Sequence, residues 1–280
     1  MARERTVIKG VVLRTADTKE SDKILTLLTP HGKLPVVAKG ARGRKSRVTA
    51  CTQLLAYSEF TLSESHGWQY LTEGSTIELF AGIRQDVGLL SLASYFAELT
   101  EAAALEGVES GEILSLLLNA LYALGTLKKP QPQVKAAFEL KLMSLIGFEP
   151  LADACACCGN PNPEDPVLDV REGVICCGKC GKGARGPGPS LPPAASTTIP
   201  GSVAARHRPG PTGLRSVHMP LSSGALAALR HVIYGEPKRL YSFSLAAEDL
   251  KKLGDASEAY VHAMLERGFG TLDFYKGLNP

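Results

Sequence analysis

Six of the seven cysteines in this 280-residue chain fall into two short clusters whose spacing is typical of a metal site. Each cluster contains a C-x₂-C pair, and eighteen residues separate the two pairs. Four thiolates in this pattern form a tetrahedral site for structural zinc, with no position left for a substrate. The expected ligands are Cys155, Cys158, Cys177 and Cys180. Cys157 and Cys176 are alternative ligands, and disulfides or a redox pair are the competing interpretations.

A second group with a chemical signature is the basic stretch from Val36 to Arg47, which begins as the end of a β-branched segment. It contains five cations, two glycines and no acidic residue. Glycine lets the backbone approach a partner closely, and clustered cations without counter-charges favour an anionic partner such as a phosphate backbone. The alternative is a solvated basic loop without a partner. The expected phosphate contacts are Lys39, Arg42, Arg44, Lys45 and Arg47.

The charge of the chain is unevenly distributed, although its net value is only +3. Residues 1–50 carry twelve Lys or Arg against four acids, a net charge of +8, whereas residues 51–125 carry one cation against ten acids, a net charge of −9. Residues 173–235 contain seven Lys or Arg and no acid. This layout predicts a nucleic-acid-binding face at one end of an otherwise neutral or acidic protein.

The element that must position the basic stretch is a run of short β-strands in the first 80 residues. Alternating, β-branched segments separated by turn signals such as Pro30-His31-Gly32 suit a small closed barrel, of which the OB-fold is the obvious example. OB-folds bind oligonucleotides with basic grooves and exposed aromatic rings. The expected strands are 6–14, 23–29, 33–38, 53–63 and 68–73 continued by 76–80.

Further candidates for DNA contact lie on this predicted barrel. Trp68 follows a predicted turn and can share a strand face with Tyr70, so it is the best candidate to stack on a base, although packing in the barrel core is the alternative. Four further cations could assist the basic stretch at the phosphates. They are Arg14, Lys19, Lys23 and Lys33.

The rest of the chain is predicted to be mainly helical, which makes the whole an α+β multidomain protein. Apolar residues at helical spacing in 86–106, 110–127 and 133–146 predict an antiparallel bundle that later helices rejoin. The expected organisation is an OB-fold domain in 1–80, a helical bundle in 81–150 and 221–280, an inserted four-cysteine zinc element in 151–182, and a Pro/Gly-rich basic linker or loop in 183–220.

Several function classes lack their sequence signatures. There is no H-E-x-x-H motif, no G-x-x-x-x-G-K-[ST] phosphate loop and no secretory h-region, and the longest uncharged apolar run is shorter than a membrane span. We therefore expect a cytoplasmic, non-enzymatic protein that does not bind membranes. A protein-interaction scaffold whose DNA contact is incidental is the alternative function, and a zinc enzyme is a weaker one.

Three stretches of the sequence carry a family resemblance. They are GVVLRTADTKESDKILTLLTPHGKLPVVAKGARGRKSR near the N-terminus, FELKLMSLIGFEP before the C-x₂-C pairs, and AYVHAMLERGFGTLDFY near the C-terminus. With these motifs the chain resembles the RecO family of bacterial DNA-repair and recombination mediators over nearly its whole length. The Pro/Gly-rich stretch from Gly183 to Pro220 departs from the family pattern.

The resemblance implies a fold, an activity and a set of partners. It implies an N-terminal OB-fold that binds single- and double-stranded DNA, annealing of complementary strands and association with RecR. It also implies contact with the acidic C-terminal tail of single-stranded DNA-binding protein and, indirectly, loading of RecA. The expected location is the cytoplasm, in association with the nucleoid.

Overall fold

The computed structural model describes residues 5–182 and 217–278. The chain divides into two compact units, Met1–Val134 with Phe269–Pro280, and Lys135–Gly268. The finer domain boundaries expected from composition stay a prediction. Most of the Pro/Gly-rich stretch expected to be a linker lies outside the described residues.

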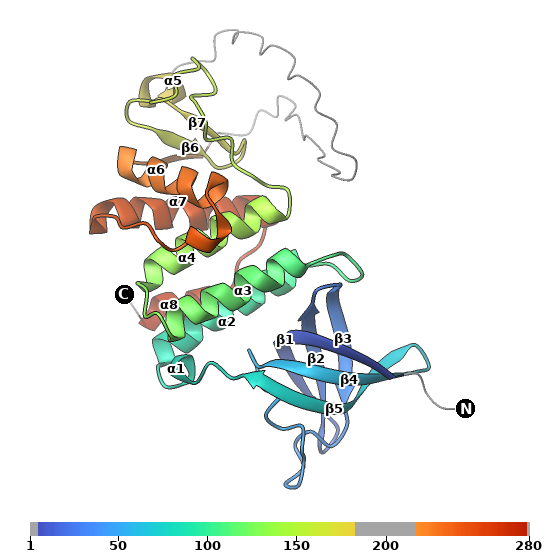
Figure 1. The fold of residues 1–280 in the computed structure, drawn as a ribbon. Helices are drawn as coiled ribbons and strands as arrows, with labels where there is room; N and C mark the ends of the chain where they lie inside the picture. The colour runs from blue at the N-terminus through green and yellow to red at the C-terminus, as the bar shows by residue number, and fades with distance from the viewer. Residues whose placement is uncertain (1–4, 183–216, 279–280) are drawn as a thin grey trace. The chain divides into compact units, whose positions relative to one another are not determined.

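A closed five-stranded barrel forms the N-terminal part of the first unit (Figure 1). Its strand order is β1-β2-β3-β5-β4, in which β3 and β5 pair in parallel and all other pairs are antiparallel. This OB-like arrangement confirms the expected α+β class with an N-terminal barrel. The strands are β1 (Arg5–Thr18), β2 (Asp22–Thr29), β3 (Gly32–Ala38), β4 (Tyr57–Ser65) and β5 (Trp68–Glu78).

The barrel interior is filled by the apolar residues that alternate along its strands. Leu25, Leu27, Phe60 and Leu62 are almost completely buried and pack in one cluster, as expected when one face of each strand turns inward. The fourth strand begins at Tyr57 rather than at residue 53, because the preceding residues form turns and Leu55 has a left-handed φ of 64°.

Four helices complete the first unit. Asp86 caps the longest of them by accepting a hydrogen bond from the Leu89 backbone N–H at 2.9 Å. The C-terminal helix packs against this long helix, with the Tyr95 and Phe269 rings edge to face at 5.6 Å. The helices are α1 (Ala81–Arg84), α2 (Val87–Ala103), α3 (Gly111–Gly125) and α8 (Gly270–Leu278).

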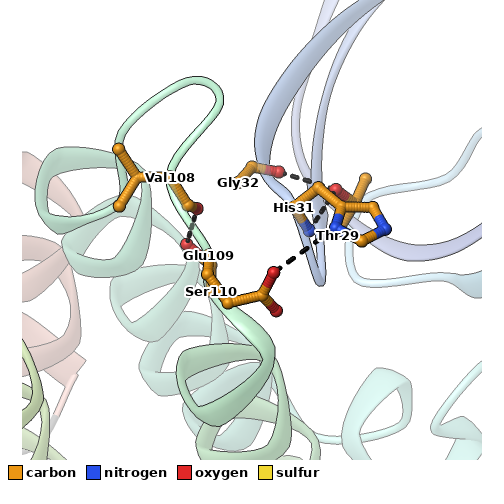
Figure 2. A network of polar contacts seen from close by, with 6 residues as sticks. All are labelled: Thr29, His31, Gly32, Val108, Glu109 and Ser110. Carbon is orange, nitrogen blue, oxygen red and sulfur yellow. Dashed lines mark hydrogen bonds and ion pairs between the residues drawn. The ribbon is translucent and has the colours of Figure 1, made fainter. Parts of the chain in front are cut away.

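The turn between β2 and β3 docks the barrel against the loop between α2 and α3 (Figure 2). The Thr29 hydroxyl donates to the Gly32 carbonyl at 2.9 Å, and His31 and Glu109 approach each other at 3.4 Å on the exposed side. The backbone N–H of Ser110 donates to the Pro30 carbonyl at 2.6 Å. The sequence signal Pro30-His31-Gly32 was therefore correctly predicted as a turn, and its partner is the helical part of the same unit.

The second unit combines three long helices with a small sheet. Lys135 is buried between α4 and α7, where it pairs with Glu139 at 2.8 Å and with Glu258 at 3.0 Å. Pro132 lies in the first turn of α4, where no backbone N–H donor is required, so the helix accommodates it. The helices are α4 (Gln131–Leu145), α5 (Gly178–Lys182), α6 (Ser223–Tyr234), η1 (Pro237–Arg239) and α7 (Ala247–Leu265), and the sheet order is β7 (Val174–Cys176), β6 (Val167–Asp169), β8 (His218–Pro220).

The docked turn predicts that Gly32→Ala destabilises the first unit. Gly32 has a φ of 104°, and a Cβ there would collide with the Leu105 backbone carbonyl. Left-handed strain alone costs about 1–3 kcal/mol, and the collision adds to it. Gly67→Ala is the matched control, because Gly67 also has a positive φ but has no atom within 4 Å of the new Cβ. Urea unfolding should show a larger loss for Gly32→Ala, and equal losses would contradict the docking.

Candidate nucleic-acid interface and metal centre

The basic loop of residues 39–47 is fixed in place by contacts to the turn between β1 and β2. The Asp22 carboxylate accepts a hydrogen bond from the Gly40 backbone N–H at 2.8 Å. The Arg42 guanidinium donates to the carbonyls of Lys19 and Glu20, both at 2.8 Å, and to the Asp17 carboxylate at 3.1 Å. Arg42 thus already has three hydrogen-bond partners on the exposed β1–β2 hairpin, and its predicted phosphate contact would compete with them.

Three other cations of the loop are free to meet a ligand. Arg44, Lys45 and Arg47 are exposed, and among the described residues no acidic side chain pairs with them. Lys39, also exposed, lies over the Tyr70 ring with its Nζ 4.6 Å from the ring centroid. The loop therefore presents unneutralised positive charge beside an aromatic ring, which suits an anionic polymer with planar bases.

Trp68 is half exposed at the start of β5, directly after the tight turn at His66 and Gly67. The pairing register is regular here, with Ser65 opposite Trp68 and Ser63 opposite Tyr70. Trp68 and Tyr70 therefore share a strand face, as the sequence predicted. The parallel pairing of Val37 with Tyr70 brings this face beside the strand that leads into the basic loop.

The other predicted DNA contacts fall into two groups. Arg14 and Lys33 bind Glu101 of α2: the Arg14 Nε lies 2.9 Å from its carboxylate and the Lys33 Nζ donates to its carbonyl at 2.7 Å. These two cations tie the barrel to the helix. Lys19, in the turn before β2, is exposed, and Lys23, near the start of β2, is half-buried. Both lie close to the Lys19 and Glu20 carbonyls that bind Arg42 of the basic loop.

The six clustered cysteines come together in the second unit. One group of four thiols has all its sulfur atoms within 4.8 Å of one another. The Sγ atoms of Cys158 and Cys177 are 3.6 Å apart, near the roughly 3.8 Å expected between two sulfurs of a tetrahedral zinc site. This group consists of the four predicted ligands, Cys155, Cys158, Cys177 and Cys180. They can hold a metal ion, and an all-thiolate donor set fits zinc.

Local backbone geometry prepares this cluster for a cation. Gly159 takes a φ of 73° and donates its N–H to the Cys155 carbonyl at 2.8 Å, which closes the first C-x₂-C turn. Burial opposes ionisation of Cys155, but backbone N–H groups, that of Cys177 among them, outweigh it and lower the pKa of Cys155 to about 6. Burial first, and then the neighbouring thiols, raise the pKa of Cys177 to about 12. The four thiols resist ionising together unless a cation compensates their charge.

Arg230 of α6 supports the first cysteine turn and was not identified from the sequence. Its guanidinium donates to the carbonyls of Ala152 at 2.7 Å, Asp153 at 3.0 Å and Pro161 at 2.6 Å. Three carbonyls on both sides of the turn are thereby held by one side chain. The available signal was weak: a single arginine within an apolar helix.

The fold and this site define a class: a protein with an OB-like barrel that carries a fixed basic loop, joined to helices and a thiolate cluster. The family model described as "Recombination protein O N terminal" matches residues 1–80, and "Recombination protein O C terminal" matches residues 84–197. No helix in the described parts of the chain is long and apolar enough to cross a membrane.

Curated relatives of this chain indicate the same family. A "DNA repair protein RecO" of Anaeromyxobacter dehalogenans is 30% identical over 281 residues, covering 99% of this chain and 98% of the relative. Proteins of the same name from Acetivibrio thermocellus, 28% identical over 96% of both chains, and Listeria monocytogenes, 34% identical over 60% of this chain and 66% of the relative, are also similar. The chain belongs to the RecO family. The names of its relatives support a role in DNA repair and recombination.

The contacts of Arg42 predict that it shapes the basic loop. Loss of hydrogen bonds to a charged group costs about 1.5–3 kcal/mol, so Arg42→Ala should speed hydrogen exchange at the Gly40 and Gly43 amides roughly tenfold or more. Arg44→Ala removes the same charge from the same loop without a described partner, and should leave both amides protected. Similar exchange in the two variants would show that Arg42 does not hold the loop.

Proposed function

We propose that this protein is a non-enzymatic recombination mediator that binds single- and double-stranded DNA through the barrel. The observation that carries the proposal is a set of three exposed cations, unpaired among the described residues, on a loop whose backbone Asp22 and Arg42 hold through hydrogen bonds. A loop that is ordered before binding loses little conformational entropy when it meets a phosphate backbone. The phosphate-contacting residues are Arg44, Lys45 and Arg47, with Lys39, Lys19 and Lys23 beside them.

Base stacking supplements these phosphate contacts. Trp68 is exposed and shares its strand face with the half-buried Tyr70, and stacking of a base on an exposed aromatic ring contributes about 1–3 kcal/mol. Stacking requires an unpaired base, so Trp68 favours single-stranded DNA, whereas the phosphate contacts serve both forms. Two strands held on the same basic surface repel each other less, which allows a protein without an active site to promote annealing.

The partners that we propose follow from family membership. The protein acts with RecR, contacts the acidic C-terminal tail of single-stranded DNA-binding protein, and so helps RecA to load onto coated DNA. It works in the cytoplasm, at the nucleoid where its DNA substrate lies.

The cysteine tetrad is proposed to hold one structural Zn²⁺. Four thiolates satisfy the tetrahedral preference of zinc and leave no open position, so the ion stabilises the element and takes part in no reaction. The residues that would hold it lie on the turn before β6, directly after β7 and in α5, so the ion joins three separate segments of the element.

The basic loop predicts the salt dependence of DNA binding. Each cation that contacts single-stranded DNA contributes a slope of about −0.7 in log K against log salt. Replacing Arg44, Lys45 and Arg47 with Ala should therefore flatten the slope by about 2. The measurement is fluorescence anisotropy with a labelled single-stranded oligonucleotide across a salt series.

A charge-matched variant controls this experiment. Lys128, Lys238 and Lys251 are exposed and no described acidic side chain pairs with them, so their replacement with Ala removes three charges from other surfaces and should keep the slope. Trp68, the only tryptophan in the chain, provides a second readout, because a stacked base should quench its fluorescence. Equal slopes in the two triple variants would favour the scaffold alternative, in which the DNA contact is incidental.

The tetrad predicts that metal removal unfolds the cysteine element. Chelation, or Cys180→Ser, should make the backbone amides of β6 and β7 exchange at least tenfold faster, because the metal supplies much of the stability of such an element. Cys51→Ser is the control, since Cys51 is buried in the barrel, donates to the Val48 carbonyl at 3.1 Å and lies outside the cluster. Unchanged exchange after verified metal loss would contradict a structural ion.

A further inference from the structure

The zinc tetrad uses four of the six clustered thiols and leaves two unexplained. The sulfur atoms of Cys157 and Cys176 lie 3.6 Å apart. Together with Cys155 they form a second group whose sulfur atoms are all within 4.8 Å of one another. Cys155 therefore belongs to both groups, and it is almost completely buried between them.

Each of the two groups contains one pair of facing sulfur atoms, one from each C-x₂-C segment or its neighbour. The neighbours Cys176 and Cys177, at the end of β7, each face one thiol of the first cluster: Cys176 faces Cys157, and Cys177 faces Cys158. Both sulfur–sulfur distances are 3.6 Å, close to the edge of a thiolate coordination polyhedron around zinc. A purely structural role for the extra pair would need only apolar contact, which does not require two sulfurs to face each other.

We propose that the six cysteines form a two-metal thiolate cluster in which Cys155 bridges the ions. The first ion is the zinc of the tetrad, so this inference rests on the proposed zinc site. The second ion is held by Cys155, Cys157 and Cys176 and belongs to the same thiophilic class, Zn²⁺ or its analogue Cd²⁺. A bridging thiolate is chemically reasonable here because the Cys177 backbone N–H donates to the Cys155 sulfur at 3.2 Å and spreads its charge.

The second ion differs from the first in its coordination. Three thiolates leave one position of a tetrahedron open, and Cys157 is only half-buried, so water completes the site. Among the described residues no carboxylate joins this group: the only ligand atoms that lie within 4.8 Å of one another are the three sulfurs, and Oδ1 of the nearby Asp169 accepts the N–H groups of Arg171 and Glu172 at 3.1 and 3.2 Å. The second ion should therefore exchange faster and be removed first by a chelator.

The test is metal stoichiometry in the full-length protein. The reduced protein is loaded with Zn²⁺, and bound metal is counted by native mass spectrometry, which also reports folding through the charge-state distribution. We expect two ions per chain. Cys157→Ser and, separately, Cys176→Ser should each keep one ion and a folded charge-state distribution, while Cys51→Ser should keep both.

Cadmium then tests the bridge directly. The Cd²⁺-loaded protein, enriched in ¹¹³Cd, should give two resonances that are scalar-coupled to each other, because one sulfur joins the ions. Two uncoupled resonances would overturn the bridge.

If the wild type binds one ion and both serine variants retain it, the proposal of a second site is overturned and the zinc tetrad stands. One ion that is lost in those variants would also overturn the inference, since the alternative ligands would then form the single site. No bound ion would overturn both the second site and the proposed zinc tetrad.

Discussion

The basic loop of this protein depends on one constraint, the clamp that Asp22 and Arg42 place on its backbone. A loop with five cations and two glycines has every physical reason to be disordered, because its charges repel and its glycines are flexible. Asp22 binds a loop amide, and Arg42 turns back to bind two carbonyls and a carboxylate of the neighbouring turn. One cation is therefore used internally, and the remaining cations are held on an ordered surface.

The cysteine element also contains a segment that could not stay ordered by itself, and different contacts hold it. Its strands β6, β7 and β8 have three residues each, too few to form a core of their own. Thiol clustering and the guanidinium of Arg230 take the place of that core: the sulfurs gather on one side of the first cysteine turn while Arg230 binds the carbonyls around it. In each unit one arginine binds the backbone carbonyls around a loop, and other side chains of that loop, cations in the first unit and thiols in the second, are left for a ligand.

The sequence allowed the architecture to be predicted where the patterns were periodic or fixed by spacing. Alternation located the five strands, and the C-x₂-C pairs identified the cysteines that the fold brings together. Local patterns could not separate cations that face solvent from those that bind the protein itself. Arg14 and Lys33 look like Arg44 and Lys45 in sequence, yet they bind Glu101, a residue more than sixty positions away. That pairing depends on tertiary contacts, which carry no local signal.

The segments that carry the family resemblance therefore need to be divided by physical role. The segments around Asp22 and from Thr29 to Lys33 serve the protein fold: the first holds the basic loop, and the second docks the barrel on the loop between α2 and α3 through the backbone hydrogen bonds of Pro30 and Lys33. If the basic loop binds DNA as proposed, a substitution of Asp22 would weaken binding without removing a DNA contact, because it would release the backbone of that loop. Binding data alone would then assign Asp22 to the interface. Hydrogen exchange separates the two roles, because it reports the order of the loop in the absence of DNA.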